Sequence, residues 1–472
     1  MKRRTFLRWV ALSSATIPFQ YLMGAYSRKR PPNIVFILID DFGWKDAGFM
    51  GSTYYETPNM DRLAKEGMVF TNAYTNAPNC APTRASLLTG QYTPRHGIYT
   101  VGNSDRGKAS LRKLIPIPNK TVLDPDKITI AEVLKEAGYV SASIGKWHLG
   151  NDPEAGPIAQ GFDVNIGGNI SGHPKSYFSP YKNKDLPDGP KGEYLTDRLT
   201  NEAIKFIQQN KDRHFFLYLP HYAVHTPLQA KKKLIQKYKN KPGSHGQNNP
   251  VYAAMIESVD HGIGLILKTL KDLKLEKNTV VIIFSDNGGV KRITSQEPLR
   301  GGKGMLYEGG IRVPLVVRWP GVVKPNSRCD VPVIGVDFFP TIMEIAGIKK
   351  PVNQPIDGMS IVPLLKGEKT LKRDALFWHF PAYLQGKAEG ARDPYFRTRP
   401  AAAIRMGNWK LIVYYEDGAL ELYNLEKDIG EQNNLASRFP EIRDKLYERL
   451  KQWQKELKAP IPTQLNPEYR GD

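Results

Sequence analysis

Four short runs of apolar, largely β-branched residues constrain the fold of this chain more than any other feature. Each run is apolar at consecutive positions instead of alternating apolar with polar residues. Strands that are buried on both faces of a sheet have this pattern, because helices cover them on either side. The runs therefore predict central strands of a covered sheet at residues 33–39, 215–219, 279–285 and 313–317.

Segments with helical periodicity separate these runs. One begins at residue 57, and two others extend over residues 195–210 and 252–273. Strands that alternate with helices indicate an α/β fold. We therefore expect a large, mixed but mostly parallel sheet sandwiched between helices. A chain of 472 residues with 40% apolar content is long enough to bury such a core.

The character of the sequence changes after about residue 370. Short strand-like runs lie at residues 402–405, 409–414 and 420–423. Gly-Asn and Asp-Gly pairs join them, which is typical of hairpin turns. A helical segment follows at residues 440–457, and residues 386–400 are interpreted as a surface loop. We expect a main α/β domain over residues 28–370 and a smaller antiparallel sheet with a closing helix over residues 371–472.

The first 27 residues have the order of an export signal. A basic segment that contains Arg3 and Arg4 precedes an apolar run over residues 9–25, and small residues follow. The Arg-Arg pair also resembles a twin-arginine signal. We expect residues 1–27 to direct export to the periplasm or the outside of the cell; a soluble N-terminal helix and an uncleaved anchor are the alternatives. No later segment reaches the ~20 apolar residues that span a bilayer, so we expect no stable membrane anchor.

The charge balance restricts the class of partner. The chain has 67 basic and 47 acidic residues and a net charge of +20. Such a surface attracts nucleic acid, anionic membranes or an anionic substrate. The longest basic cluster, residues 231–233, is interpreted as a solvated helix face, and no zinc-finger, homeodomain or RNP pattern is present. We therefore expect no nucleic-acid partner and favour a polyanionic substrate.

Acidic residues follow two of the predicted strands directly. Asp40 and Asp41 come after the first strand, and Asp286 and Asn287 come after the run at residues 279–285. Sites in α/β folds lie at the carboxyl ends of strands, and adjacent carboxylates repel each other unless a cation lies between them. A turn explains either pair alone. Together they favour oxygen ligands for Ca²⁺ or Mg²⁺ rather than zinc.

Cys80 and Cys329 are the cysteines of the chain, which excludes a disulfide scaffold and leaves one disulfide between them as an alternative. Cys80 opens an eleven-residue string that ends at Gly90, at the start of an apolar helical segment. This string resembles the C-x-P-x-R-x-x-x-L-T-G signature of type I sulfatases, arylsulfatase-like members of the alkaline phosphatase superfamily. The resemblance implies that a formylglycine-generating maturase oxidises Cys80 to formylglycine. It implies no role for Cys329.

Further segments extend the resemblance over nearly all of the chain after the signal. They are the strand end at 40–41, G-K-W-H-L-G at 145–150, the segment 221–227, S-D-N-G at 285–288, and K-G-x-x-x-E-G-G-x-R-V-P at 303–314. The catalytic residues that the resemblance implies are Cys80, Arg84, Lys146, His148, His225 and Lys303. The calcium ligands that it implies are Asp40, Asp41, residue 80, Asp286 and Asn287.

The resemblance also implies a mechanism. One hydroxyl of hydrated formylglycine attacks sulfur, and the other later collapses to the aldehyde and expels sulfate. Asp286 would be the base for the attacking hydroxyl, and calcium would pull on a sulfate oxygen. Arg84 and the two lysines would supply fixed positive charge. His225 or Lys303 would protonate the leaving alcohol, and His148 would assist the collapse.

The substrate is less constrained. Residues 172–181 look like the corresponding segment of bacterial polysaccharide sulfatases, which favours a galactose or N-acetylgalactosamine sulfate. The side chains that we expect near a bound sugar are His173 and Tyr177, with Arg95, His96, His379 and Arg405 as further candidates. Packing of a loop is the alternative for them. The rival functions are a phosphonate or phosphate ester hydrolase of the same superfamily, and a non-catalytic carbohydrate-binding protein with an unmodified Cys80.

Overall fold

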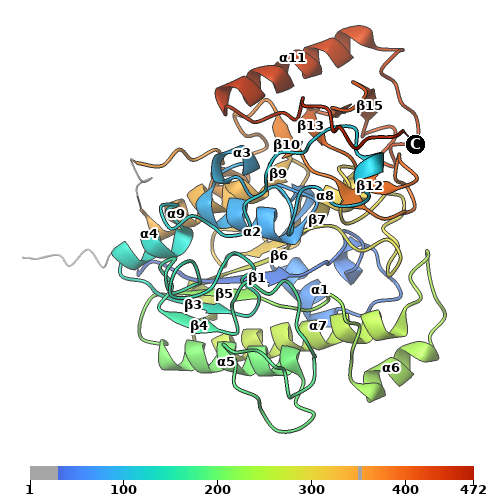
Figure 1. Ribbon diagram of the computed structural model, residues 1–472. Coiled ribbons are helices and arrows are strands. Elements are labelled where there is room, and N and C mark those ends of the chain that lie inside the picture. Colours follow the sequence, from blue (N-terminus) through green and yellow to red (C-terminus); the bar gives the residue numbers. More distant parts are fainter. Residues whose placement is uncertain (1–29, 349–352, 472) are drawn as a thin grey trace, which may run out of the picture. The chain divides into compact units, whose positions relative to one another are not determined.

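The computed structural model describes residues 30–348 and 353–471 (Figure 1). The export signal expected at residues 1–27 lies outside these residues. From Pro31 on, the described residues form one compact unit, so the domain boundary expected near residue 370 stays a prediction. No helix in the described ranges combines the length and the apolar content that crossing a bilayer requires.

A nine-stranded sheet forms the centre of the described chain. Its strands are β1 (Asn33–Ile39), β2 (Met68–Tyr74), β3 (Val140–Ile144), β4 (Val164–Ile166), β5 (Phe215–Pro220), β6 (Thr279–Ser285), β7 (Arg312–Arg318), β8 (Ser327–Cys329) and β9 (Val333–Ile334). The order is β4-β3-β5-β1-β6-β7-β2-β8, and β9 also pairs with β2. Pairing is parallel from β4 to β6 and becomes antiparallel on both sides of β7. The mixed, mostly parallel sheet is confirmed.

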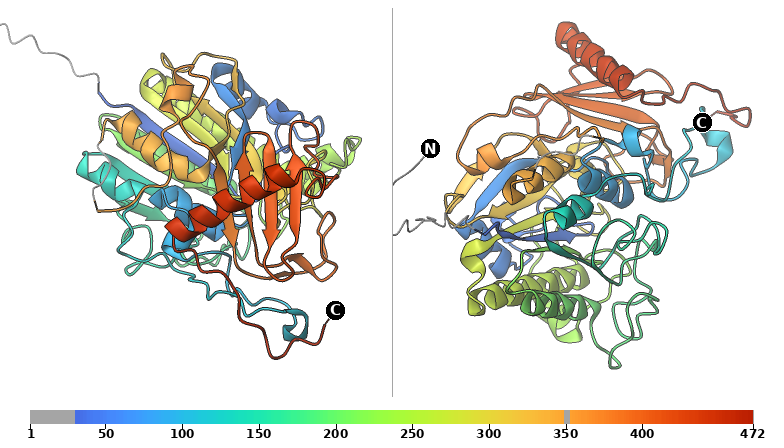
Figure 2. Two further views of the ribbon diagram at one scale, coloured as in Figure 1. Left: turned by 90° about the horizontal axis from the view of Figure 1, so that it is seen from above. Right: turned by 90° about the vertical axis from the view of Figure 1, so that its left-hand side faces the viewer.

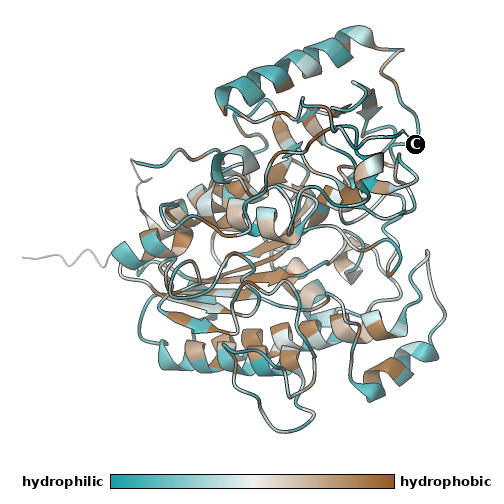
Figure 3. Ribbon diagram, viewed as in Figure 1, coloured by the Kyte–Doolittle hydropathy of each residue, from teal (hydrophilic) through white to brown (hydrophobic). Residues whose placement is uncertain are grey.

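Helices cover both faces of this sheet (Figures 1 and 2). They are α1 (Pro58–Glu66), α2 (Cys80–Thr89), α3 (Thr93–His96), α4 (Ile130–Glu136), α5 (Leu195–Gln209), α6 (Lys232–Lys239), α7 (Pro250–Asp272), α8 (Glu308–Ile311), α9 (Phe338–Ala346) and α10 (Val362–Leu365). α1, α5 and α7 pack on one face, and α2, α4, α9 and α10 pack on the other. The central strands β1, β5 and β6 are mostly apolar, whereas the outer helices expose polar faces (Figure 3).

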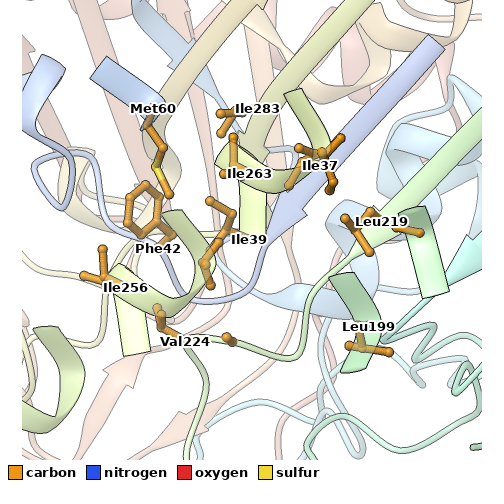
Figure 4. Close-up of a cluster of buried hydrophobic side chains, with 14 of the residues drawn as sticks. Ile37, Ile39, Phe42, Met60, Leu199, Leu219, Val224, Ile256, Ile263 and Ile283 are labelled. Atoms are coloured by element: carbon orange, nitrogen blue, oxygen red, sulfur yellow. The ribbon is translucent and has the colours of Figure 1, made fainter. Parts of the chain in front are cut away.

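The long helix α7 shows how one face is closed. Ile256 and Ile263 of this helix pack with Ile37 and Ile39 of β1 (Figure 4). Its start is set by Asn249, whose side chain accepts hydrogen bonds from the first backbone N–H groups of the helix. The three helices expected from periodicity are therefore confirmed as α1, α5 and α7, with ends that differ by one or two residues.

A second, antiparallel sheet with the order β10-β13-β14-β15 follows, and α11 packs on it. The elements are β10 (Leu376–Phe380), β13 (Ala401–Met406), β14 (Trp409–Tyr414), β15 (Leu420–Asn424) and α11 (Pro440–Glu456). This confirms the small sheet and its closing helix. The surface loop expected at residues 386–400 needs correction, because it contains β12 (Phe396–Thr398), which pairs with β11 (Leu384–Gln385). Strands of two or three residues leave no periodicity to detect.

Buried charges join the second sheet to the first part of the chain. Lys410 of β14 lies 2.9 Å from a carboxylate oxygen of Glu308 in α8 and 2.8 Å from one of Glu431, and all three side chains are fully buried. Burial opposes ionisation of Glu308, but Lys410 and then Arg312 outweigh it and lower the pKa of Glu308 to about 2. Burial raises the pKa of Glu431 to about 7. Lys410 is thus the counter-ion that the two buried carboxyls share, and Arg312 lies 3.2 Å from Glu308 as a second cation.

We expect Lys410→Met to lower the free energy of unfolding by about 3 kcal/mol, because it leaves Glu308 and Glu431 buried without their shared counter-charge. Chemical denaturation of the purified variant measures this. Arg443→Ala, which removes an exposed pair with Asp444, is the control and should leave stability nearly unchanged. Equal stability of the two variants would contradict the assignment.

Candidate active site

The site begins where parallel strands end side by side. Ile39 of β1 pairs with Ser285 of β6, so the residues that follow the two strands emerge next to each other. The ladder also continues past β1, because the backbone N–H of Asp40 donates to the carbonyl of Ala223 at 3.0 Å. Carboxylates that directly follow these strands must therefore meet at one edge of the sheet.

Three carboxylates meet there. Oxygen atoms of Asp40, Asp41 and Asp286, together with the sulfur of Cys80, lie within 4.8 Å of one another. Asp40 Oδ1 and Asn287 Oδ1 are buried and have no hydrogen-bond partner in the described residues. Burial, and then the charge of Asp286, raise the pKa of Asp40 to about 8. A hard divalent cation would satisfy the two oxygens and offset the repulsion, so the donor set fits such an ion.

Three cationic side chains counter the carboxylates. The pairs are Lys146 with Asp40 at 2.6 Å, Arg84 with Asp286 at 2.7 Å, and Lys303 with Asp41 at 2.5 Å. Burial raises the pKa of Asp41 and Asp286, but the effect of the cations is larger in sum and holds both values below normal. Arg84 also donates to the carbonyl of Lys146 at 2.7 Å, which fixes the two cations relative to each other.

Cys80 is the first residue of α2 and is almost fully buried. Burial raises the pKa of its thiol to about 12, although Lys146 and Lys303 pull in the other direction. The thiol is therefore protonated at neutral pH, which makes an unmodified Cys80 a poor nucleophile. Cys80 and Cys329 are both free, so the alternative of a disulfide between them is excluded.

Two neutral histidines complete the group. His225 Nε2 lies 3.7 Å from Asp41 Oδ2, and its Nδ1 lies 2.7 Å from the carbonyl of Thr226. Burial and the charge of Lys303 lower the pKa of His225 to about 3. Burial, followed by the charge of Lys146, holds the pKa of His148 well below normal. Both rings are uncharged at neutral pH in the absence of a bound anion.

A cleft of about 740 Å³ opens above these groups. The expected catalytic residues that line it are Cys80, His148, His225 and Lys303, together with the expected metal ligand Asp41. Arg84 and Lys146 lie beneath its floor and are fully buried. The structure therefore brings together every residue that the motifs single out, at one end of the sheet.

The two expected sugar contacts behave differently. His173 lines the cleft, and its ring stacks on that of His225 with 6.1 Å between centroids. Tyr177 is fully buried and does not reach the cleft, which corrects the expectation of a substrate contact. Its hydroxyl hydrogen-bonds to the carbonyls of Tyr222 and His225, at 2.6 and 2.8 Å. Tyr177 therefore positions the segment that carries His225.

The four further candidates are also corrected, because none of them lines the cleft. His96 contacts Ser86, His379 lies between Tyr415 and Pro460, Arg405 hydrogen-bonds to Tyr74, and Arg95 pairs with Asp357. Each of these four side chains makes a hydrogen bond or an ion pair with a buried or half-buried partner. The residue type alone does not show in which direction a side chain points, so the sequence could not exclude them.

Sequence reasoning missed the wall of the cleft that faces the carboxylates. That wall consists of Arg106, Lys291, Arg292, residues 385–389 and Arg397. These residues come from loops and from the β11–β12 hairpin, far apart in the chain. No strand end or motif marks them; an excess of arginine in loops is the one signal that the sequence offers.

Fixed cations beside a carboxylate cluster that fits a hard metal ion suit the binding of a tetrahedral oxyanion, which is the arrangement expected of a hydrolase of anionic esters. The family model "Sulfatase" matches residues 32–348, and the model "N-sulphoglucosamine sulphohydrolase, C-terminal" matches residues 302–456. The chain thus belongs to the sulfatase family and is a sulfuric ester hydrolase.

Individual relatives agree with the family match. The chain is 34% identical to a sulfatase of Formosa agariphila, over 91% of this chain and 90% of the relative. It is 35% identical to the human N-acetylgalactosamine-6-sulfatase, over 80% of this chain and 73% of the relative. Among solved structures, Ps i-CgsB in complex with k-i-k-neocarrahexaose is 31% identical, with a TM-score of 0.75 over 93% of this chain and 95% of that one.

We expect Tyr177→Phe to lower the turnover number several-fold with little change in KM, because the carbonyls of Tyr222 and His225 lose their shared donor. Unfolding free energy should fall by about 1 kcal/mol. Tyr194→Phe is the matched control: its buried hydroxyl donates to the carbonyl of Gln229 instead, so stability should fall similarly while turnover stays. A rise in KM in Tyr177→Phe but not in Tyr194→Phe would instead indicate that Tyr177 contacts the substrate.

Proposed function

We propose that the chain hydrolyses sulfate esters of sulfated carbohydrates through a formylglycine at position 80, with a calcium ion at the carboxylate cluster. The observation that carries the proposal is the placement of Cys80. This buried residue lies at the helix start, within 4.8 Å of the three carboxylates, on the floor of a cleft with basic walls. Assays on sulfated carbohydrates after maturation of Cys80, described below, test it.

Residue 80 would supply the nucleophile. The buried thiol at the start of α2 lies within 4.8 Å of the three carboxylates, where a modified side chain can face both the metal ligands and the cleft. In hydrated form, formylglycine carries two hydroxyls on one carbon, so one can attack sulfur and the other can release sulfate as the aldehyde reforms. Asp286 remains our prediction for the base that accepts the first proton, because Arg84 keeps it ionised. Conversion requires the formylglycine-generating maturase as a partner.

The carboxylates would hold calcium. Asp40, Asp41, Asp286 and Asn287 are the proposed ligands, joined by residue 80 after its modification. The buried, unpartnered oxygens of Asp40 and Asn287 support this assignment. When bound, calcium supplies a Lewis acid that withdraws electron density from a sulfate oxygen.

The remaining groups would handle charge and protons. Lys303 lines the cleft and presents a fixed positive charge to the transferring group, while Arg84 and Lys146 hold the charge beneath the floor. The positive charge of Lys303 is one reason that the pKa of His225 is low. A bound sulfate would offset that charge and let His225 hold the proton for the leaving alcohol. His148 would assist release of sulfate from residue 80.

We propose galactose or N-acetylgalactosamine sulfate as the sugar class. The human relative is named an N-acetylgalactosamine-6-sulfatase, and the solved structure of Ps i-CgsB holds a neocarrahexaose. His173 lies in the cleft beside His225, where it can contact the sugar ring. Residues of the β11–β12 hairpin line part of the cleft, and we propose that they limit access there and so favour a terminal sugar over an internal one.

Co-expression with the maturase should convert Cys80, and mass spectrometry of the tryptic peptide should show replacement of the thiol by an aldehyde. Cys80→Ser should lose about 10³-fold or more in kcat, because serine lacks the second hydroxyl. Cys329→Ser, which changes the other buried cysteine at the far edge of the sheet, should keep full activity. Wild-type turnover in Cys80→Ser would rule out this mechanism.

Added Ca²⁺ should raise the melting temperature, because a ligand that binds only the folded state stabilises it, by about 2.7 kcal/mol at a hundred-fold excess over Kd. Asp40→Asn should abolish this shift in melting temperature. Elemental analysis should find one equivalent less of bound calcium in this variant. Asp260→Asn removes a buried carboxylate that caps α1, so it should destabilise the chain but keep the calcium shift. An unchanged melting temperature after exhaustive chelation contradicts a metal site.

Fragments of carrageenan or chondroitin sulfate should release free sulfate, whereas phosphate and phosphonate esters should release no phosphate or phosphonate. The kcat/KM on these fragments should fall as salt rises, and fall less on a small aryl sulfate, because screening acts within a Debye length of ~8 Å at physiological ionic strength. Heparan sulfate and fucoidan fragments complete the panel. Sulfate release from steroid sulfates alone would overturn the carbohydrate assignment while leaving the catalytic residues in place.

A further inference from the structure

Three arginines converge at the wall of the cleft that faces the carboxylate cluster. Arg106 follows α3 in a long loop, Arg292 follows β6, and Arg397 lies in β12. The loop of Arg106 contacts the hairpin directly, because a Cβ on its neighbour Gly107 would lie 2.6 Å from the ring of Phe396. Three separate segments therefore bring guanidinium groups into one cavity.

These arginines lack the partners that arginines elsewhere in the chain have. Among residues 30–348 and 353–471, no carboxylate forms an ion pair with Arg106, Arg292 or Arg397. Within the part of the chain that the structure describes, the side chain of Arg397 donates a hydrogen bond to the backbone carbonyl of Gln385, at 3.3 Å. By contrast, Arg399, two residues further along, binds both Asp393 and Glu416.

The electrostatics of Arg106 and Arg397 are unfavourable without a ligand. Burial lowers the pKa of Arg106, and burial followed by the charges of Arg106 and Arg292 lowers the pKa of Arg397. Arg106 and Arg397 are half-buried and Arg292 is exposed. An oxyanion that accepts their forked hydrogen bonds would offset the repulsion between them. The nearby Lys291 differs, because its ammonium already lies 3.4 Å from Glu389.

The cluster lies close to the reaction centre but apart from it. A Cβ on Gly304 would lie 3.6 Å from Nη1 of Arg397, so this guanidinium passes over the residue next to Lys303. The charge of Asp41 is also felt at Arg397. A cleft of about 740 Å³ has room for much more than one sulfate group, so a bound sugar can reach both places.

We propose that Arg106, Arg292 and Arg397 form a second oxyanion subsite, which binds another anionic substituent of the carbohydrate whose sulfate is cleaved. The proposal rests on the proposed function, since it assigns a specificity subsite to the same cleft. The subsite makes the enzyme selective for carbohydrates with at least two charged groups, one of which is retained in the product.

The test compares two matched oligosaccharides that differ only in the second sulfate, together with an aryl sulfate. Arg106→Gln and Arg397→Gln should each lower kcat/KM on the disulfated oligosaccharide about ten-fold, mainly through KM, as loss of one charge-assisted hydrogen bond predicts. Neither variant should change kcat/KM on the monosulfated oligosaccharide or the aryl sulfate by more than about two-fold. Arg397→Lys should recover part of the loss.

Arg62→Gln is the matched control, because it removes one exposed arginine on α1, remote from this cleft. It should leave the preference for the disulfated substrate intact, which separates local binding from general attraction by the basic surface. A third substrate carries a carboxylate in place of the second sulfate. If the arginine variants lower kcat/KM on this substrate too, the subsite accepts a carboxylate; if they lower it only on the disulfated substrate, the subsite selects a sulfate.

Equal losses on all substrates, or no loss on any, would overturn the subsite. Melting temperatures close to wild type confirm that the variants fold. Failure of the proposed function gives a different result, because the wild-type enzyme would then release no sulfate from either oligosaccharide while the aryl sulfate assay still reports on the catalytic residues.

Discussion

The repulsion between Asp40, Asp41 and Asp286 is the constraint on which the rest of this structure depends. Moving even one ion of this kind out of water costs several kcal/mol in a real protein. The parallel register of β1 and β6 nevertheless forces the three carboxylates together. Arg84, Lys146 and Lys303 offset this repulsion through their ion pairs with the three carboxylates. Lys303 can then face a sulfate group without reorganising, while Arg84 and Lys146 hold their charge beneath the floor of the cleft.

The sequence predicts the part of the molecule in which local pattern and function coincide. Consecutive apolar residues identify the central strands, and the residues just after them must share one edge of the sheet. The residues at the floor of the site, from Asp40 to Lys303, could be predicted because each of them lies in a contiguous sequence motif. A sequence pattern shows neither how deeply a side chain is buried nor in which direction it points. For this reason Tyr177 and His96 were expected near the sugar, whereas both lie in the interior.

The facing wall could not be predicted for a different reason. Arg106, Arg292 and Arg397 are separated by more than a hundred residues, and each lies in a loop or a short strand with no periodicity. They meet only in the folded chain, where the β11–β12 hairpin that carries Arg397 lies against the loop of Arg106.

The β11–β12 hairpin has a further consequence. It touches the cleft through Gln385, residues 386–389 and Arg397, yet it contributes nothing to the floor on which bond cleavage takes place. Leu384 and Phe396 anchor it, since both side chains are buried. Insertions, deletions or recombination in this hairpin can therefore change which glycans the enzyme accepts during evolution, without altering the residues that cleave the sulfate ester. Because the hairpin is separate from the catalytic residues of the floor, it is a suitable segment to randomise in directed evolution of substrate specificity.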